Sequence, residues 1–524
     1  MSKTVVGNYR DRLQGRGFEE LPQLFQDVFD IAEKLNVRYV WIDSICIIQD
    51  GDEGADWRAE APKMAQYYQY SLCTVAGTFA DPDCSLLRPF PETSVPWVSR
   101  LVRLPYRDRN QTKKGYFYIY KRRLPLLEDY WTTICNSTIF RRGWVLQEWL
   151  LSKRLVWYTP SGLFFECHTV SPTSDSQASL NSQHAKPDLL AHLSLKESFY
   201  ATKTSILDFW YRVIEVYTTS HLTKPEVDRI LAVAGLAREV AQILRLATSN
   251  ARWGSVRPSR EVYLSGLWLR DIHRGLLWME AHNAAPSETS IATAPTWSWS
   301  SILTPVTWDL SQNSNFVPSC TLTGFCLHNL GGSSPHLEPE YIYRGGSNVG
   351  IGLGANYMTG PLDLTSMSAC LHLRGVLITV HVRGYLATGE NLRTAASLTA
   401  YTPSPAAEKC HWRALCSPLA PEVIVGWGSL ERLRMKPESW TDGVESDRTV
   451  PECADFGRAV YGLHVSIRKL KTGLLVKRFD KVADVLLLER LDSGAYSRLG
   501  VGRIGDAELV QTVEQGDTRD LVLL

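Results

Sequence analysis

The stretch that most constrains the fold is residues 38–50, RYVWIDSICIIQD. Most of its side chains are apolar and several are β-branched, which predicts a buried strand over residues 38–48 that is covered on both faces. Asp43 and Ser44 interrupt the run, at the point where we expect the strand to reach the end of a sheet. In open α/β sheets that edge is where ligands bind. We therefore expect Asp43 and Ser44 to lie at a binding site.

The elements around this stretch predict an α/β domain over residues 1–170. Apolar side chains at spacings of three and four indicate an amphipathic helix over residues 18–36. Asp56 is a suitable cap for a helix that runs to residue 70, with Pro62 tolerated near its first turn. A short strand is expected at residues 72–76. The alternation of helix and strand favours a mainly parallel sheet.

After residue 140 the pattern of predicted secondary structure changes twice along the chain. After a helix that begins at Arg142 and Gly143, short strands and a polar linker follow. We expect a mainly helical region over residues 187–310 and a β-rich region over residues 315–524. The expected strands and linker are residues 155–158, 163–167 and 171–186.

Length, charge and cysteine usage narrow the class of protein. A chain of 524 residues predicts two to four domains. The formal charge of +1 gives no general attraction to nucleic acid, and no apolar run approaches the roughly 18 residues that span a bilayer. Eleven cysteines are scattered singly, and no secretory signal is evident, so we expect reduced thiols in the cytosol or nucleus and assign a cytoplasmic location.

Three motifs in order resemble those of fungal heterokaryon-incompatibility (HET) domain proteins. They are YVWIDSICIIQD at residues 39–50, Trp57-x-x-Glu60-x-x-Lys63-Met64, and RGWVLQE at residues 142–148, with LFFEC at residues 163–167 after them. The resemblance implies a role in nonself recognition and programmed cell death. Family members usually begin with a strand resembling Tyr-x-x-Leu-Ser-Tyr-x-Trp-Gly, which this chain lacks, so the domain is expected to be N-terminally truncated and without its first strand.

The resemblance also implies a reaction. HET domains are distantly similar to TIR domains, some of which hydrolyse NAD with a glutamate on a helix after a tryptophan. This similarity makes Glu60 the first catalytic candidate and Asp43 the second, since a carboxylate beside the ribose stabilises an oxocarbenium-like state. Trp57 would stack on a base of the nucleotide, and Ser44 and Arg142 are further substrate-binding candidates. NAD enters only as a substrate, and no cofactor is expected.

Each candidate also has a purely structural interpretation. A glutamate near a helix start favours the helix dipole wherever it occurs, which covers Glu60, and a tryptophan such as Trp57 is more often a packing residue. Asp43 requires a partner or a ligand. For the third motif we favour an ion-pair and hydrogen-bond network that closes the domain over substrate contact. Its members are Arg142, Trp144, Gln147 and Glu148.

Two cysteine–histidine groups do not support a metal site. They are Cys320-x5-Cys326-x-His328 and Cys410-His411-x4-Cys416, and neither has the paired short spacing of structural zinc sites. We therefore expect no metal.

Three functions stay open at this point. The first is a cell-death effector that acts by TIR-like NAD hydrolysis. The second is a non-enzymatic assembly module that forms homo-oligomers or binds another incompatibility protein. The third is a HET-like scaffold in small-molecule (secondary metabolite) biosynthesis, with a tryptophan-rich pocket for an apolar intermediate.

Overall fold

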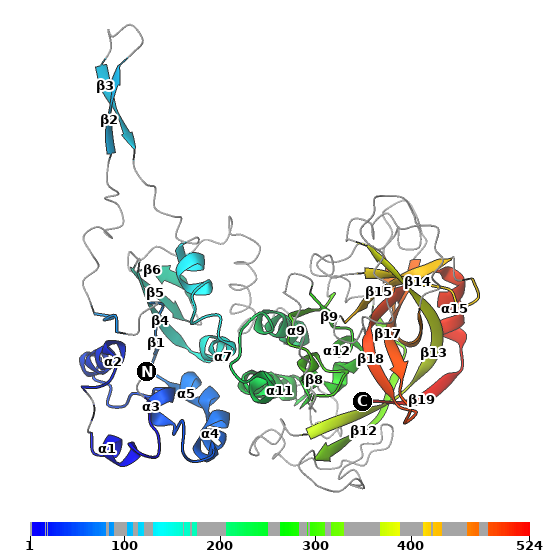
Figure 1. Ribbon diagram of the computed structural model, residues 1–524, viewed down its shortest axis with the longest axis horizontal. Helices are drawn as coiled ribbons and strands as arrows, with labels where there is room; N and C mark the ends of the chain where they lie inside the picture. The colour runs from blue at the N-terminus through cyan, green and yellow to red at the C-terminus, as the bar shows by residue number, and fades with distance from the viewer. Residues whose placement is uncertain are drawn as a thin grey trace. The chain divides into compact units, whose positions relative to one another are not determined.

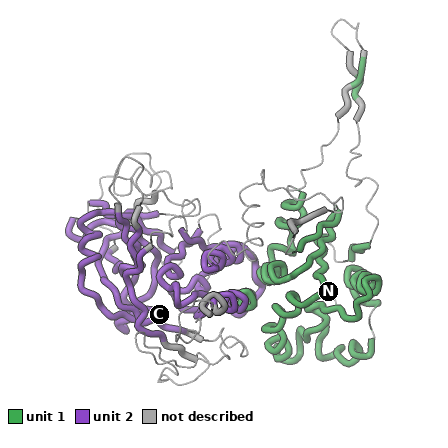
Figure 2. Tube along the Cα trace, turned by 180° about the vertical axis from the view of Figure 1, so that it is seen from behind, with its two compact units in different colours: residues 1–204, 232–236 green, residues 205–231, 237–524 purple. Residues whose placement is uncertain are grey.

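The chain divides into two compact units, which Figure 2 colours separately. Unit 1 comprises Met1–Thr204 and Ala232–Leu236, and unit 2 comprises Ser205–Leu231 and Ala237–Leu524. The computed structural model describes residues 3–15, 17, 19–79, 83–87, 102–107, 114–119, 129–160, 162–167, 170–174, 206–249, 263–281, 291, 294–309, 316–329, 367–387, 412–420, 423–431, 458–470 and 480–524.

Short helices make up most of the first 70 residues of unit 1 (Figure 1). The helix expected at residues 18–36 is confirmed, and it begins at Gln23 after Pro22, whose fixed φ suits a helix start. The helix expected to end at residue 70 is also present, but a 3₁₀ turn at Pro62 divides it. The α-helices of this unit among the described residues are α1 (Tyr9–Leu13), α2 (Gln23–Lys34), α3 (Asp43–Cys46), α4 (Ala55–Glu60), α5 (Met64–Tyr70) and α7 (Gly143–Leu151), and a π-helix covers Trp131–Cys135.

In the part of unit 1 that the structure describes, the main sheet has four strands in the order β1-β4-β5-β6. They are β1 (Thr74–Gly77), β4 (Arg154–Thr159), β5 (Gly162–Cys167) and β6 (Val170–Ser174). The expectation of a mainly parallel sheet was wrong, because only β1 and β4 are parallel, while β5 is antiparallel to both of its neighbours. The reason is the two-residue connection between β4 and β5, since a parallel crossover needs about a dozen residues. A separate antiparallel hairpin joins β2 (Val102–Arg107) and β3 (Lys114–Ile119).

The buried strand expected at residues 38–48 is not present. Residues 37–42 have no regular secondary structure, and the helical turn α3 begins at Asp43. The Asp43 carboxylate accepts a hydrogen bond from the Ser44 backbone N–H at 2.6 Å, and the Ile42 carbonyl accepts one from the Cys46 N–H at 2.7 Å. A short polar side chain that bonds to nearby backbone competes with strand pairing, which explains the turn.

Glu166 is a buried carboxylate in the core of unit 1. Glu166 on β5 is 1% exposed and accepts hydrogen bonds from the Tyr130 hydroxyl at 2.5 Å, the Trp157 indole N–H at 2.6 Å and the Trp149 indole N–H at 2.8 Å. These bonds tie α7 and β4 to β5. The carboxylate therefore holds the helix that carries the third sequence motif against the sheet.

Unit 2 opens with helices and then short strands. The described helices that open it are α9 (Ile206–Tyr217), α10 (Pro225–Leu231), α11 (Ala234–Ser249, whose first residues belong to unit 1) and α12 (Ile272–Gly275). Short strands interrupt the mainly helical region expected over residues 187–310. A two-residue hairpin joins β7 (Tyr263–Leu264) and β8 (Leu267–Trp268) through Ser265 and Gly266, which have φ of 45° and 93°. Positive φ at both central residues is typical of tight hairpin turns.

The β-rich region expected after residue 315 is confirmed, and its described residues form a nine-stranded sheet. The strands β16, β17, β18, β15, β14 and β13 are neighbours in that order, and β13 also pairs with β16, so these six close into a ring. The nine strands are β11 (Phe316–Pro318), β12 (Thr321–Asn329), β13 (Met367–Ala387), β14 (Trp412–Cys416), β15 (Ile424–Leu430), β16 (Arg458–Leu470), β17 (Asp480–Arg490), β18 (Tyr496–Ile504) and β19 (Thr518–Leu523).

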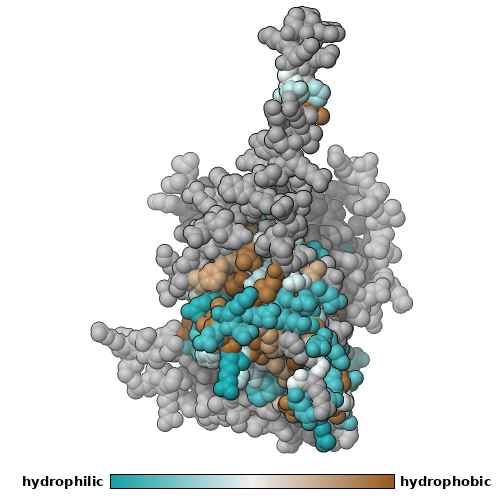
Figure 3. Space-filling model, turned by 90° about the vertical axis from the view of Figure 1, so that its left-hand side faces the viewer, coloured by the Kyte–Doolittle hydropathy of each residue, from teal (hydrophilic) through white to brown (hydrophobic). Residues whose placement is uncertain are grey.

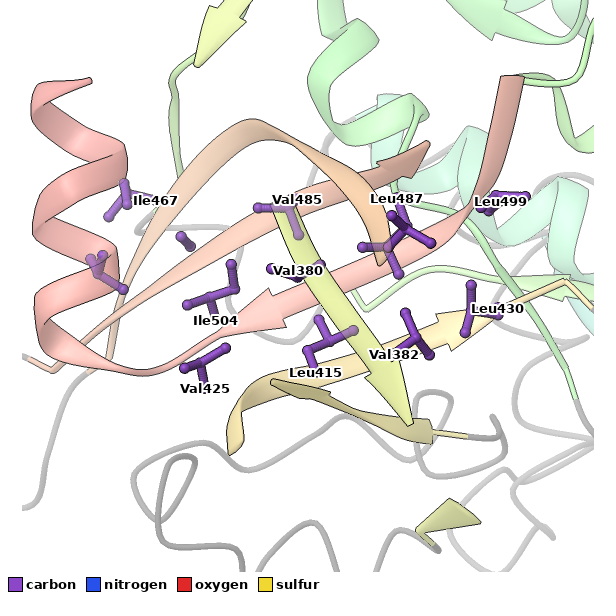
Figure 4. Close-up of a cluster of buried hydrophobic side chains, with 13 residues drawn as sticks. Val380, Val382, Leu415, Val425, Leu430, Ile467, Val485, Leu487, Leu499 and Ile504 are labelled. Carbon is purple, nitrogen blue, oxygen red and sulfur yellow. The ribbon is translucent and has the colours of Figure 1, made fainter. Parts of the chain in front are cut away.

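Apolar side chains fill the ring, as Figure 4 shows for the cluster that includes Val380, Leu415 and Val485. Helix α15 (Ala507–Gln515) packs on this cluster through Val510. The Asp506 side chain caps the helix by accepting a hydrogen bond from the Leu509 N–H at 2.9 Å.

Unit 2 also buries charges. Asp484 on β17 lies between two buried arginines, with the Arg468 Nε 2.5 Å from its Oδ2 and the Arg503 Nε 3.4 Å from its Oδ1. Both arginines also reach the Asp309 carboxylate, at 3.4 and 3.2 Å. All four side chains are at most 3% exposed, so each charge relies on this network in place of water.

Two further expectations bear on the whole chain. Cys370 on β13 is disulfide-bonded, so the expectation that every cysteine is reduced was wrong. Among the described residues, no helix is both long and apolar enough to cross a membrane.

Candidate functional site

Helix α3 places Asp43, Ser44 and Cys46 on one short turn. The Ser44 hydroxyl oxygen is buried and makes no hydrogen bond to any residue that the structure describes. Desolvation of the sulfur raises the Cys46 pKa, and the negative charges of Asp43 and Glu60 raise it further. A hydrogen bond from the Ile42 N–H opposes this rise without cancelling it. The thiol is therefore a weak nucleophile at neutral pH, and the chemistry of this turn rests on Asp43.

Glu60, at the end of α4, is an ionised carboxylate with both oxygens engaged. Its Oε1 accepts a hydrogen bond from the Lys63 ammonium at 2.7 Å, and its Oε2 accepts one from the Tyr67 hydroxyl at 2.5 Å. The bond from Lys63, followed by that from Tyr67, lowers the Glu60 pKa. Burial and the bond to Glu60 raise the Tyr67 pKa to about 12. A carboxylate held in this way is a poor proton acceptor.

Glu148, on α7, has the opposite character. Burial, followed by the negative charge of Asp43, raises its pKa to about 7, while the positive charge of Arg142 and a hydrogen bond from Tyr68 oppose this rise. Burial and the charge of Glu148 also raise the Tyr68 pKa well above its usual range. Asp43 and Glu148 are thus neighbouring carboxylates whose environments differ, with Tyr68 and Arg142 beside them. We call Asp43, Tyr68, Arg142 and Glu148 the carboxylate cluster.

Aromatic rings surround these carboxylates. The Trp41 ring lies 5.0 Å from that of Tyr67 and 5.7 Å from that of Tyr68. Trp57 and Trp144 meet edge to face, with 6.0 Å between their ring centroids. Both tryptophans are half-buried, so part of each ring is accessible to solvent.

Apolar side chains also reach the surface of unit 1. Tyr39 is 80% exposed, Tyr70 is 72% exposed and Leu13 is 70% exposed. On the face drawn in Figure 3, hydrophobic residues lie among hydrophilic ones. Single exposed side chains of this kind are normal on a protein surface and do not by themselves indicate a docking site.

Gln147 has a structural position. It is 1% exposed, and its side-chain oxygen accepts a hydrogen bond from the Gly235 N–H at 2.9 Å. A Cβ at Gly235 would lie 2.4 Å from both that oxygen and the Ala65 Cβ, closer than atoms can approach. Gln147 therefore fixes residues 232–236 to the rest of unit 1.

The structure brings several of the predicted residues together. Asp43, Arg142 and Glu148 belong to one cluster, Glu60 lies close to it through Cys46, and Trp57 packs on Trp144. Sequence reasoning missed Tyr67 and Tyr68. Helical spacing offered a signal, because residues seven or eight positions after Glu60 fall near the same helix face.

No group of three or more potential metal ligands occurs among the described residues. Of the two cysteine–histidine groups, the side chains of Cys326 and His328, and all of Cys410 and His411, lie outside the described part of the chain.

Comparison with known proteins identifies the N-terminal part of the chain. Residues 6–148 match the family "Heterokaryon incompatibility protein (HET)", so the resemblance is confirmed and these residues are a HET domain. The match includes every member of the carboxylate cluster as well as Glu60. The domain indicates a function in heterokaryon incompatibility and cell death. No curated protein and no solved structure matched the chain.

Proposed function

We propose that the HET domain is a cell-death effector that hydrolyses the N-glycosidic bond of NAD, in the manner of a TIR-like enzyme, and that Glu148 is its proton acceptor. The observation that supports this is the pair Asp43 and Glu148, in which burial and the charge of Asp43 raise the Glu148 pKa to about 7. A base that titrates near the working pH is the most effective in general acid–base catalysis. Two carboxylates in different environments are also typical of glycoside cleavage.

The reaction balances with the residues of this cluster. The bond between the ribose C1′ and the nicotinamide nitrogen breaks, and its electron pair neutralises the positively charged ring. The Asp43 carboxylate stabilises the positive charge that develops on the ribose. Water adds to C1′, and its proton passes to the Glu148 carboxylate. The products are nicotinamide, ADP-ribose and one proton.

Other residues fit the remaining parts of the substrate. Arg142 is exposed, and an arginine guanidinium suits the diphosphate of a dinucleotide. The half-buried rings of Trp57 and Trp144 offer stacking surfaces for a base. In this proposal Glu60 is a positioning residue, because Lys63 and Tyr67 occupy its oxygens, and it acts by holding α4 and α5 beside the cluster.

The test is release of nicotinamide from NAD by the purified full-length protein and by three glutamate-to-glutamine variants. Glu148→Gln keeps the shape of the side chain but cannot accept the proton, so we expect activity to fall at least about 100-fold. Glu60→Gln is expected to lose less than about tenfold, because the amide oxygen can accept from Lys63 while the amide NH₂ donates to the Tyr67 hydroxyl oxygen. Glu33→Gln, on the exposed part of α2, is the matched control and should retain full activity.

The outcomes separate the alternatives. Equal activity of Glu148→Gln and Glu33→Gln would overturn the assignment of the base. A larger loss in Glu60→Gln than in Glu148→Gln would return the catalytic role to Glu60. Absence of nicotinamide release by the wild-type protein, together with cell toxicity that Glu148→Gln retains, would favour the assembly module.

A further inference from the structure

A pocket of about 400 Å³ lies in unit 2, where the end of α15 meets the sheet. It is formed by the end of α15 together with residues of β11, β13, β16, β17 and β19, all within this unit. Its apolar wall consists of Val317, Val376, Ile467 and Val513. The volume falls in the range of small-molecule sites, about 300–1,000 Å³. This pocket is independent of the carboxylate cluster and of the chemistry proposed there.

His464 supplies the main polar group of the pocket. It is 2% exposed, and hydrogen bonds to the backbone of Ser466 and Val513 engage the imidazole. Its Nε2 nevertheless has no partner within hydrogen-bonding geometry among the described residues. A buried polar atom without a hydrogen-bond partner destabilises the folded state. A ligand group that bonded to Nε2 would remove this cost.

The backbone around His464 is shaped for this position. The pairing of β16 with β17 shifts by one residue between His464 and Ser466, which is a β-bulge. Bulges redirect side chains and are common beside binding sites. Gly516, at the end of α15, also lines the pocket, and a Cβ there would lie 2.7 Å from Val376 Cγ1. The bulge and the glycine together allow the helix end and the imidazole to share one cavity.

The charges of the pocket are balanced. Lys481 and Glu514 form an ion pair at 2.7 Å at its rim, where both are partly exposed. Burial lowers the His464 pKa, so the imidazole is neutral at pH 7. With no net charge among the lining groups, an ionic ligand would have to displace one partner of the rim pair.

We propose that this pocket binds a small neutral molecule with an aliphatic body and one hydroxyl or carbonyl group, which hydrogen-bonds to His464 Nε2. The four β-branched side chains contact the aliphatic body. The rim pair disfavours a carboxylate or an ammonium group at the entrance.

The test compares three probes with the same eight-carbon chain, added to the full-length protein in isothermal titration calorimetry. We expect 1-octanol to bind at one site and octanoate and octylammonium to bind at least about tenfold more weakly. Thr518→Trp fills the entrance from the start of β19 and should abolish binding of 1-octanol. Arg519→Trp is the matched control, because adjacent strand residues point to opposite faces and Arg519 does not line the pocket.

His464→Phe removes the polar atom and keeps a ring of similar size. We expect it to weaken 1-octanol binding about tenfold, the loss of one hydrogen bond. Circular dichroism establishes that each variant is folded, and the C2–H signal of His464 in NMR of the wild-type protein reports contact with 1-octanol without any substitution. Binding of octanoate as tight as that of 1-octanol would overturn the proposal, and so would unchanged binding in Thr518→Trp or a C2–H signal that does not move.

Discussion

Replacing Glu148 with glutamine removes a negative charge that destabilises the folded state. Burial and the charge of Asp43 raise the Glu148 pKa from 4.5 to about 7. One pKa unit corresponds to 1.36 kcal/mol, so ionised Glu148 destabilises the folded state by at most about 3 kcal/mol. Because the native state binds the extra proton between these two pKa values, the free energy of unfolding falls as pH rises from about 4.5 to 7.

Glutamine at this position does not titrate, so the variant should lack this part of the pH dependence. We expect Glu148→Gln to gain stability relative to the wild-type protein as pH rises from 4.5 to 8, by at most about 3 kcal/mol. In a unit of about 200 residues this corresponds to a Tm difference of about 6–12 °C, measurable by calorimetry at both pH values. Glu33→Gln is the control. A Tm difference between Glu148→Gln and wild type that is the same at pH 4.5 and pH 8 would refute the reasoning.

Two further predictions concern packing and buried charge, both read from thermal unfolding. Gly235→Ala should destabilise the protein by about 1–3 kcal/mol, because its Cβ would overlap Ala65 and Gln147. Gly7→Ala is the control and should have little effect, since a Cβ there meets no atom within 4 Å. Equal Tm values for the two variants would count against the close contact at Gly235. Asp484→Asn should lower the free energy of unfolding by about 3–5 kcal/mol, because it removes a negative charge that two buried arginines contact. Asp520→Asn is the control, since it breaks only an exposed ion pair with Arg374 and should leave the Tm unchanged. An Asp484→Asn protein as stable as Asp520→Asn would show that the buried network is dispensable.

Local signals in the sequence predicted helices well. Pro22 marks the start of α2, and Arg142 and Gly143 mark that of α7, because helix starts depend on a few neighbouring residues. The tail was only partly predicted. The pattern of β-branched and apolar residues indicated strands. It did not predict α15, which Asp506 caps, and it did not predict that β13 pairs with β16 to close the ring. Closure of this kind depends on contacts between residues far apart in the chain.

The stretch at residues 38–50 shows where periodicity is insufficient. An apolar run predicts burial only if a neighbouring strand is available to pair with it, and here the backbone at Ser44 and Asp50 bonds instead to Thr4 and Val6. The same stretch still supplies Asp43 to the candidate site. Tertiary packing brings Asp43, Tyr68 and Glu148 together. The sequence motifs therefore identified Asp43 and Glu148, but they could not show that the charge of Asp43 raises the Glu148 pKa.

The most direct test of the proposed function is the pH profile of nicotinamide release from NAD, measured as kcat/KM for the full-length protein. If Glu148 accepts the proton, it must be ionised, so kcat/KM should rise with an apparent pKa of about 7 and level off above it. Because Glu60 is already ionised well below this pH, its use as the base would give no such rise. A profile that is flat between pH 6 and 8, or that falls across this range, would contradict the account.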